Sequence, residues 1–328
     1  MSEKAPVITF AGKPYPMRPD ETVLDGLERG GAKVPNSCRS GICQSCLMHA
    51  VVGTPPSEAQ IGLSERERER GFFLACICRP QEDLSIILPS DDEPPYRATV
   101  TAKEWLVGNV LRLRLARPAG FDYKPGQFIN LRRRGSDVVR SYSLASIGSD
   151  TFLELHIRRI PDGSMTSWIF DVLEPGDSLD FYGPFGECFY QAESLDQPLL
   201  LAGTGTGLAP LLGILRDAFA RGHRGPIHLL HGGLSVEGLY LIEAMQELAA
   251  AHPQMRYTPC VLRGDAPAGG AVGSIDRALT EVVGALNGWS CYLCGDPGIV
   301  EKLRVECFMH GADFLDVHAD AFAPSVKP

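Results

Sequence analysis

Three closely spaced cysteines near the start of the chain restrict its fold more than any other feature. Cys38, Cys43 and Cys46 follow the spacing C-x4-C-x2-C, and Cys76 follows after 29 intervening residues. Thiolates at this spacing can converge only if the segment that carries them forms a tight loop. The pattern therefore predicts a small domain that is built around a thiolate-ligated metal centre.

The composition of this segment favours a [2Fe-2S] cluster held by all four cysteines. The same spacing, with one distant fourth cysteine, is that of plant-type [2Fe-2S] ferredoxins. Gly41 and three serines lie in the loop, and small residues let backbone N–H groups point at the cluster sulfurs. The alternative is a structural zinc site, but zinc frameworks usually offer cysteines in close pairs.

The fourth ligand has two candidates, because Cys78 lies two residues beyond Cys76. On a strand, alternation would point both side chains to the same face. The segment Phe73-Leu74-Ala75-Cys76 resembles the fourth-ligand segment of plant-type ferredoxins. We therefore choose Cys76.

The pattern of expected strands and helices changes twice along the 328 residues, and a chain of this length suits two or three domains. The acidic, proline-bearing segment Ser90–Pro95 is a linker candidate. Beyond Gln197 the pattern changes from repeated strands to strands that alternate with helices. These changes predict three domains, at residues 1–93, 94–195 and 196–328.

Each predicted domain has its own pattern of elements. Short strands surround the cysteine loop of the first, Gly- and Pro-rich turns separate strands of a small antiparallel barrel in the second, and helices cover a parallel sheet in the third. The expected strands are Val7–Phe10, Leu47–Val52, Leu84–Leu88, Ala98–Lys103, Val110–Ala116, Gln127–Arg132, Ser141–Ala145, Thr151–Arg158, Ser178–Tyr182, Pro198–Ala202, Ile227–His231 and Ser290–Cys294. One short helix is expected to begin near Asp20–Leu24. The other expected helices cover Ser64–Arg70, Leu208–Ala220, Glu237–Ala250 and Pro297–His310.

Charge and hydropathy bear on the partners. A formal charge of -9 argues against a nucleic-acid-binding face. The longest uncharged stretch, Pro198–Leu215, contains four glycines and two prolines, so we expect no membrane insertion. Ten cysteines without a secretory signal predict metal or redox chemistry in the cytoplasm.

A four-residue motif in the second domain indicates a flavin site. Arg140-Ser141-Tyr142-Ser143 matches R-x-Y-S, and strand alternation would place Arg140 and Tyr142 on one face. The motif resembles that of flavin-binding barrels in the ferredoxin reductase family. The resemblance implies that Arg140 binds the FAD pyrophosphate, that Tyr142 contacts the flavin, and that Ser143 forms a hydrogen bond near the flavin N5.

A second segment of this domain resembles the phosphate-binding turn of the same family. Pro161–Ser167 precedes a helical stretch, and the N–H groups at a helix N-terminus bind phosphate. An ordinary turn with a helix cap would look the same. The residues that the resemblance implies as cofactor contacts are Gly163, Ser164, Met165, Thr166 and Ser167.

A glycine turn opens the third domain. The apolar run Leu199–Ala202 leads into Gly203-Thr204-Gly205-Thr206-Gly207-Leu208-Ala209-Pro210, and a strand, a glycine turn and a helix together cradle phosphate. The turn resembles the G-x-G-x-x-P of ferredoxin reductases, because a proline replaces the last glycine of the Rossmann motif. The resemblance implies dinucleotide contacts from Gly205, Thr206, Gly207 and Pro210.

Two later segments complete the nicotinamide site. Cys294-Gly295-Asp296-Pro297 matches the family's C-G-x-P, which implies cofactor contacts from Cys294, Gly295 and Asp296 and a catalytic site made of Cys294 and Ser143. A redox C-x-x-C pair with Cys291 is the alternative, although the two would not face a common partner well inside a strand. Asp320-Ala321-Phe322 resembles the family's final segment, in which an aromatic ring, here Phe322, covers the flavin or its adenine.

The three motifs resemble, in order and over nearly the whole chain, the one-component reductases of bacterial multicomponent oxygenases. The resemblance implies a multidomain α+β and α/β fold: a β-grasp ferredoxin domain, an antiparallel FAD-binding barrel and an α/β NAD-binding domain. Electrons would pass from NADH through FAD and a [2Fe-2S] cluster to a terminal oxygenase or similar electron-accepting protein. Reductases for deoxysugar dehydration share this domain order, and a binding-only electron carrier is the alternative outside enzymes.

The segment His231–Glu237 bears on the choice of dinucleotide. It follows the second strand of the third domain and offers neither Arg nor Lys for a 2′-phosphate. The sequence therefore predicts NADH rather than NADPH.

Overall fold

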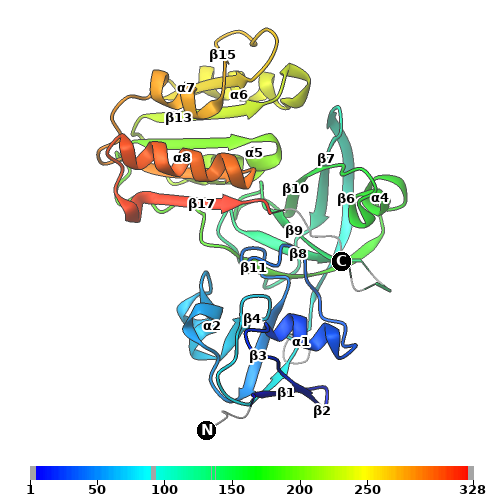
Figure 1. The fold of residues 1–328 in the computed structure, drawn as a ribbon. Helices are drawn as coiled ribbons and strands as arrows, with labels where there is room; N and C mark the ends of the chain where they lie inside the picture. The colour runs from blue at the N-terminus through cyan, green and yellow to red at the C-terminus, as the bar shows by residue number, and fades with distance from the viewer. Residues whose placement is uncertain (1–4, 90–93, 134, 137, 324–328) are drawn as a thin grey trace.

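The chain forms three sheets that follow one another in sequence (Figure 1). The structure is a computed structural model and describes residues 5–89, 94–133, 135–136 and 138–323. Part of the predicted linker, residues 90–93, lies outside the described residues. The mixed α+β and α/β class predicted from the sequence is confirmed, whereas the domain boundaries stay predictions.

The first sheet is mixed and has the strand order β2-β1-β5-β3-β4. Strands β1 and β5 are parallel, and the other neighbours are antiparallel. Helix α1 packs its apolar residues Val23, Leu24 and Leu27 into the core of this sheet, which is the β-grasp arrangement. The elements are β1 (Val7–Phe10), β2 (Lys13–Pro16), α1 (Val23–Arg29), β3 (Leu47–Val52), α2 (Glu65–Glu69), β4 (Phe72–Leu74) and β5 (Leu84–Ile87).

The second sheet is antiparallel throughout, with the order β10-β7-β6-β11-β8-β9. A bridge between Leu144 and Leu155 links the ends of the order and closes the sheet into a barrel. Helix α4 buries Met165, Ile169 and Phe170 in the same core. The elements are β6 (Tyr96–Val107), β7 (Val110–Ala116), β8 (Phe128–Arg132), β9 (Val139–Ser143), β10 (Phe152–Arg158), α4 (Ser164–Asp171) and β11 (Ser178–Phe185).

The third sheet is parallel, with the order β15-β14-β13-β12-β16-β17. Leu199 and Leu201 of β12 face the core beneath α5 and α6, while Leu200 and Ala202 face the core beneath α7 and α8. The order reverses between β12 and β16, where parallel sheets bind ligands. The elements are β12 (Leu199–Thr204), α5 (Leu208–Ala220), β13 (Ile227–Gly233), α6 (Ile242–Ala251), β14 (Met255–Val261), β15 (Ala271–Val272), α7 (Ile275–Val282), β16 (Ser290–Gly295), α8 (Pro297–Met309) and β17 (Val317–Ala321).

One predicted helix begins later than expected. Helix α6 starts at Ile242 rather than Glu237, because residues 236–238 form a 3-10 turn and Leu241 adopts a left-handed conformation, with φ of 55°. The strands β2, β4, β14, β15 and β17 and the helix α7 were not predicted. Strand β14 contains Pro259, which obscures its pattern.

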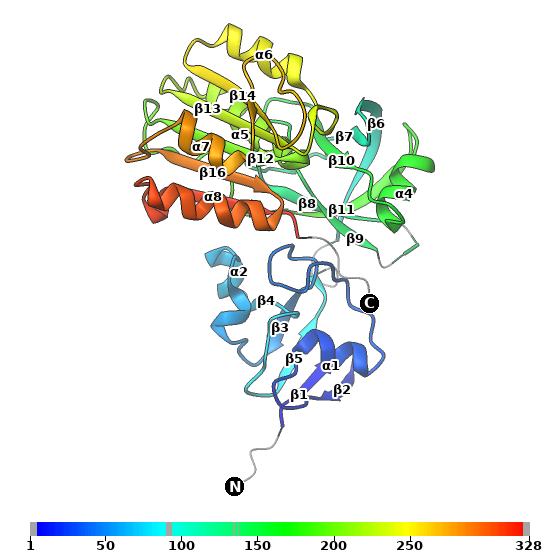
Figure 2. The same cartoon turned by 45° about the horizontal axis from the view of Figure 1, so that its top comes forward.

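The barrel and the third sheet share apolar core, whereas the first sheet has a core of its own. Ala145 and Cys188 of the barrel region belong to the cluster that covers one face of β12. At Gly213 of α5, a Cβ would lie 2.6 Å from the carbonyl oxygen of Leu144. Phe185 of β11 packs against the core of the first sheet, which lies below the other two in both ribbon views (Figures 1 and 2).

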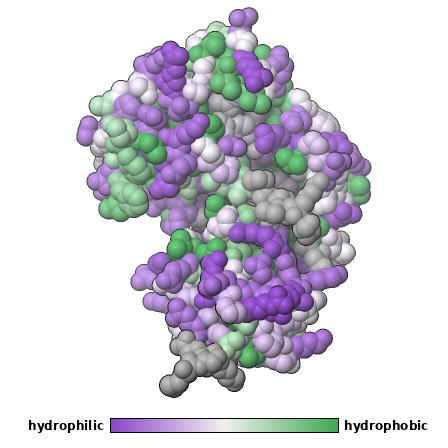
Figure 3. Space-filling view, viewed as in Figure 1, coloured by the Kyte–Doolittle hydropathy of each residue, from purple (hydrophilic) through white to green (hydrophobic). Residues whose placement is uncertain are grey.

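The face of the molecule seen in Figure 3 is mainly hydrophilic, and its hydrophobic residues form small scattered groups. Of the helices in the described part of the chain, none has the length and apolar character needed to cross a membrane.

Candidate functional site

The cysteine loop lies between α1 and β3 and depends on left-handed backbone conformations. Arg39, Gly41 and Gln44 have φ of 54°, 79° and 53°. The Arg39 guanidinium forms ion pairs with Asp25, at 3.1 Å, and with Glu28, both on α1. The ion pairs fix the outer turn of the loop to the helix.

Backbone N–H groups point at the cysteine sulfurs, as the small residues of the loop predict. The N–H groups of Ser40 and Cys43 each lie 3.4 Å from Sγ of Cys38, and the N–H of Cys38 lies 3.4 Å from Sγ of Cys43. Hydrogen bonds from the Cys43 thiol and these N–H groups lower the pKa of Cys38 to about 4. The loop thus stabilises negative charge on sulfur.

The four predicted ligands form two pairs. Cys38 is hydrogen-bonded to Cys43 and Cys46 to Cys76, and all four are buried. Within the described residues, no three His, Cys, Asp or Glu side chains converge as they would on a single metal ion. Two pairs of thiols fit two irons that each take two thiolates, which is the arrangement that a [2Fe-2S] cluster needs.

Cys76 and Cys78 have different surroundings. Strand β4 ends at Leu74, so the alternation that would align the two side chains does not apply. The Cys46 thiol and the Gly41 N–H hydrogen-bond to Cys76 and lower its pKa. Both cysteines belong to the apolar core of the first sheet, but for Cys78 burial acts alone and raises its pKa to about 12. The geometry favours Cys76 as the fourth ligand.

A cavity of about 470 Å³ lies where the three modules meet. It brings together segments that are far apart in sequence: the cysteine loop, strand β9, the turn before α4, the glycine turn and the end of β17. Its lining includes the predicted residues Arg140, Tyr142, Ser143, Gly163, Ser164, Met165, Thr166 and Phe322, together with Thr206 and Cys43. The predicted cofactor-binding residues that do not line this cavity are Ser167, Gly205, Gly207, Pro210, Cys294, Gly295 and Asp296.

The R-x-Y-S strand and helix α4 can hold an anionic, aromatic cofactor in this cavity. Arg140 contributes a guanidinium, and burial raises the pKa of the Tyr142 phenol, which therefore stays neutral. Helix α4 begins after Gly163 with no side-chain cap, so its first N–H groups are available to a pyrophosphate. The donor set fits FAD.

The glycine turn lies against the end of β16 at the topological switch point. A Cβ at Gly207 would lie 2.4 Å from the Cys294 carbonyl oxygen, and one at Gly295 would lie 2.7 Å from the Thr204 carbonyl oxygen. Pro210 lies in the first turn of α5. Backbone approach this close requires glycine and leaves a cradle of the kind that nicotinamide dinucleotides occupy.

Asp296 has a structural role in addition to the one the motif implies. Its carboxylate caps α8 and accepts hydrogen bonds from Gly298 N–H, at 3.0 Å, and Ile299 N–H, at 3.2 Å. Pro297 takes the first position of that helix.

The two cysteines of the C-x-x-C alternative do not form a pair. Cys294 belongs to the core on one face of the sheet, with its Sγ 3.8 Å from Sγ of Cys188. Cys291 belongs to the core on the opposite face, beside Cys307. The structure thus excludes a shared redox site.

Two residues of the site were not singled out from the sequence. Asp320 accepts a hydrogen bond of 3.2 Å from Ser143, and burial raises its pKa from 3.8 to about 6. Arg158 lines the 470 Å³ cavity where the three modules meet. Its Nη1 atom lies 3.4 Å from the position that a Cβ atom on Gly205 would occupy. The arginine pair Arg158-Arg159 before the Pro161 turn is a signal in the sequence, but it does not by itself distinguish Arg158 from its neighbour.

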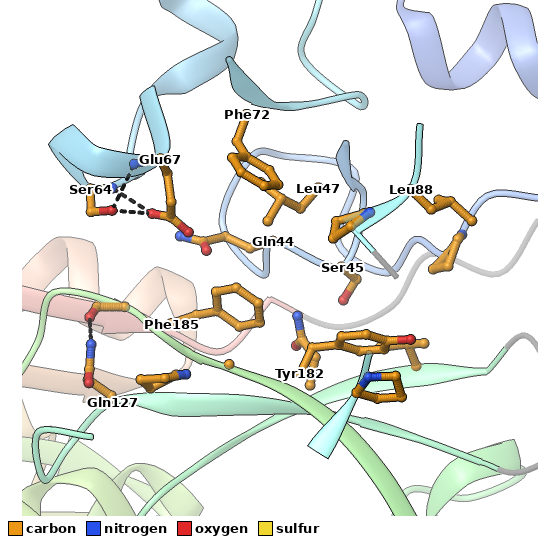
Figure 4. A pocket seen from close by; sticks show the side chains of 18 of the residues that line it. Gln44, Ser45, Leu47, Ser64, Glu67, Phe72, Leu88, Gln127, Tyr182 and Phe185 are labelled. Carbon is orange, nitrogen blue, oxygen red and sulfur yellow. Dashed lines mark hydrogen bonds between the residues drawn. The ribbon is translucent and has the colours of Figure 1, made fainter. Parts of the chain in front are cut away.

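A second cavity, of about 450 Å³, lies between the first module and the barrel (Figure 4). Gln44, Ser45 and Leu47 line it from the cysteine-loop side, and Tyr182 and Phe185 from the barrel side. None of the predicted site residues lines it.

Comparisons with known proteins match each module. Residues 9–81 match the 2Fe-2S iron-sulfur cluster binding domain, residues 97–190 the oxidoreductase FAD-binding domain, and residues 201–304 the oxidoreductase NAD-binding domain. The match to the first module agrees with the paired thiols and argues further against zinc.

Relatives match over almost the whole chain. The reductase subunit of an aromatic O-demethylase from Amycolatopsis sp. is 36% identical, over 90% of this chain and 91% of that protein. The reductase component of the naphthalene 1,2-dioxygenase system of Pseudomonas putida is 33% identical, over 94% and 95%. A crystal structure of a cytochrome P450 reductase from Amycolatopsis aligns with a TM-score of 0.71 and 32% identity, and covers 98% of this chain and 100% of that one.

The assignment of the fourth ligand can be tested with two matched variants. We expect Cys76→Ser to lose the cluster or destabilise it severely, and Cys78→Ser to keep it, because only Cys76 lies beside Cys46. Iron, labile sulfide and visible absorbance after anaerobic purification are the measurements, with about two irons per chain expected in the wild type. The reverse pattern would move the ligand to Cys78, and stoichiometric zinc without iron would exclude the cluster.

The buried carboxyl of Asp320 makes the FAD-free protein less stable as the pH rises. Its folded pKa lies above its unfolded pKa, so the stability linked to its proton is present below about pH 4 and is lost as the pH rises through 6. We expect Asp320→Asn to raise the free energy of unfolding by roughly 2 kcal/mol at pH 7.5 and to change it little at pH 4.

Urea unfolding of FAD-free protein at the two pH values measures this effect. The exposed Asp265→Asn is the control, and it should leave the free energy of unfolding unchanged at both. A loss of stability in Asp320→Asn at pH 7.5 would show that the carboxylate is stabilising.

Proposed function

Because this chain belongs to the family of reductase components in which a 2Fe-2S ferredoxin domain is joined to FAD- and NAD-binding oxidoreductase domains, we propose that it delivers electrons from NADH to the terminal component of an oxygenase system. The chain is an oxidoreductase. One observation carries the proposal: Cys43, the R-x-Y-S strand, the glycine turn and the Asp320–Phe322 segment all line one cavity.

The chemistry follows from the groups that this family binds. When bound, these groups would supply hydride transfer from NADH, conversion of two electrons to single ones at FAD, and one-electron transport at the cluster. The work of the protein is orientation and electrostatics. Arg140 and the N-terminus of α4 offer positive charge to the pyrophosphate, and Phe322 offers an aromatic surface at the rim of the cavity.

Ser143 and Cys294 are the proposed catalytic residues, with Asp320 beside them. The Ser143 hydroxyl donates to the Asp320 carboxylate, and Asp320 pairs with Cys294 in the register of β16 and β17. Burial raises the pKa of the Cys294 thiol, so it acts as a neutral packing and hydrogen-bonding group rather than a nucleophile. Ser143 and Asp320 line the cavity, and Cys294 lies buried directly behind Asp320, so the three residues would support the nicotinamide ring from the end of β16 and β17.

We place the protein in the cytoplasm, since all ten of its cysteines are free and reduced thiols are typical of that compartment. The partner is proposed as an oxygenase component because the relatives are named for aromatic O-demethylase and dioxygenase systems. No relative reported above is named for deoxysugar dehydration, and the matched NAD-binding domain argues against a binding-only carrier.

Two acceptors measured side by side test the order of electron flow. In full-length Cys76→Ser, we expect reduction of ferricyanide by NADH to persist, because the FAD and NAD modules hold none of the cluster cysteines. Reduction of cytochrome c should fall at least about tenfold, because single electrons leave for a protein through the cluster. FAD content is the folding control. Cytochrome c reduction at the wild-type rate without iron would contradict the proposed order.

The proposed preference for NADH rests on the residues after β13. Hydrogen bonding to Ser235 lowers the pKa of Glu237, so this segment carries a carboxylate where a 2′-phosphate needs a cation. Arg263 lies nearby, since its N–H bonds to the Leu234 carbonyl at 3.0 Å.

We expect kcat/KM to be at least about tenfold higher for NADH than for NADPH, because charge-assisted hydrogen bonds to the phosphate contribute about 1.5–3 kcal/mol where a site provides them. Glu237→Lys should raise kcat/KM for NADPH. Arg263→Ala should leave kcat/KM for NADH unchanged. A wild-type preference for NADPH would contradict the prediction, and loss of that preference in Arg263→Ala would identify Arg263 as the phosphate contact.

A further inference from the structure

We propose that Asn130 and Ser141 are positioning residues that hold the cysteine loop against the flavin-binding strands and thereby set the route of the electron into the cluster. The proposal rests on the proposed function and concerns residues outside the predicted ligands.

The contact is made at the backbone of a predicted cluster ligand. The Cys43 carbonyl oxygen accepts from the Ser141 hydroxyl at 3.1 Å and from the Asn130 side-chain N–H at 3.4 Å. The Ser141 hydroxyl also lies 2.6 Å from Oδ1 of Asn130. Because a hydroxyl has one hydrogen, Ser141 donates either to the Cys43 carbonyl or to Oδ1 of Asn130, and in the second case the Asn130 amide remains as the donor to the carbonyl. The three groups therefore form one small network.

The barrel presents these two side chains as a pair. Asn130 of β8 and Ser141 of β9 are partners in the strand register, whereas the neighbours Ile129 and Leu131 point into the barrel core. Asn130 is 2% exposed. A buried amide requires hydrogen-bond partners, and Asn130 has one on its own sheet and one on the cysteine loop. Both polar atoms of its side chain therefore have a partner when the first module is docked.

The network also connects the cysteine loop to the wall of the flavin cavity, which Ser141 itself helps to line. Tyr142, next to Ser141, lines the flavin cavity, and so does Cys43. A single hydrogen bond thus links the backbone of a cluster ligand to the strand that carries the proposed flavin contact.

Packing alone does not fix this side of the loop. The 450 Å³ cavity lies directly beside Gln44 and Ser45, the residues that follow Cys43, and separates them from Tyr182 and Phe185 (Figure 4). Gln44 has a left-handed backbone, with φ of 53°. Next to a cavity, directional hydrogen bonds are what can hold the Cys43 carbonyl in one place.

Three variants of the full-length protein with FAD and cluster test the proposal: Ser141→Ala, Asn130→Leu, and Ser141→Thr, which keeps the hydroxyl. Stopped-flow mixing with NADH gives the rates of flavin bleaching and of cluster reduction in the same sample. We expect the ratio of cluster reduction to flavin reduction to fall about fivefold in Ser141→Ala, as for the loss of one ordinary hydrogen bond, and to recover in Ser141→Thr. Amide hydrogen exchange of residues 37–47 should become faster in Ser141→Ala and Asn130→Leu but not in Ser141→Thr.

Wild-type rate ratios and wild-type exchange in both Ser141→Ala and Asn130→Leu would overturn the proposal. The proposal would also be overturned if Ser141→Thr lowered the ratio of cluster reduction to flavin reduction as much as Ser141→Ala does. If NADH fails to reduce the cluster of the wild type, the proposed function itself is wrong. If Asn130→Leu does not fold, Ser141→Ala and its threonine partner decide the matter.

Discussion

The arrangement of this protein depends on the hydrogen-bonded contact between the cysteine loop and the strands β8 and β9. The loop is fixed to α1 on one side by the ion pairs of Arg39 and reaches the barrel on the other through the Cys43 carbonyl. Because Cys43 is both a proposed ligand and a lining residue of the central cavity, its position relates the first module to the other two. Electron transfer across a chain of modules requires such a fixed relation.

The two other modules are joined in a different way. The barrel and the parallel sheet share apolar core, and α5 approaches the barrel backbone at Gly213. Burial of apolar surface stabilises that junction as it would the interior of one domain. The first module keeps its own core and adds Phe185 as an apolar contact. The FAD and NAD modules, which hydride transfer requires, thus meet at a tight apolar junction. The first module, which cluster reduction requires, meets the barrel at a looser, hydrogen-bonded junction.

Buried polar groups cluster where these junctions meet. His156 of β10 hydrogen-bonds to Glu154 and to Tyr240 of the third module, both at 3.0 Å. Burial lowers the pKa of His156, while His156 and two arginines offset burial and hold the pKa of Glu154 at about 2. A neutral histidine and a charged glutamate can therefore bridge the barrel and the parallel sheet without leaving an unpaired charge.

The sequence alone determined the features that are local along the chain. The C-x4-C-x2-C loop, the R-x-Y-S strand and the glycine turn each occupy a few consecutive residues, and short-range spacing specifies the backbone that such segments adopt. Most strands and helices were predicted within a few residues for the same reason. Patterns failed where a left-handed residue delays a helix, as at Leu241, or where a proline interrupts a strand, as at Pro259.

Only the tertiary structure decided which of these segments touch. Ser143 and Asp320 are 177 residues apart, and Ser141 and Cys43 are 98 apart. The prediction of Cys76 rather than Cys78 as a ligand, which rested on a resemblance in the sequence, gains support from the end of β4 and from the neighbouring Cys46. Hydrophobic periodicity records which face of an element is buried but not which distant element covers it. The contacts that join the modules therefore become visible only when the chain is folded.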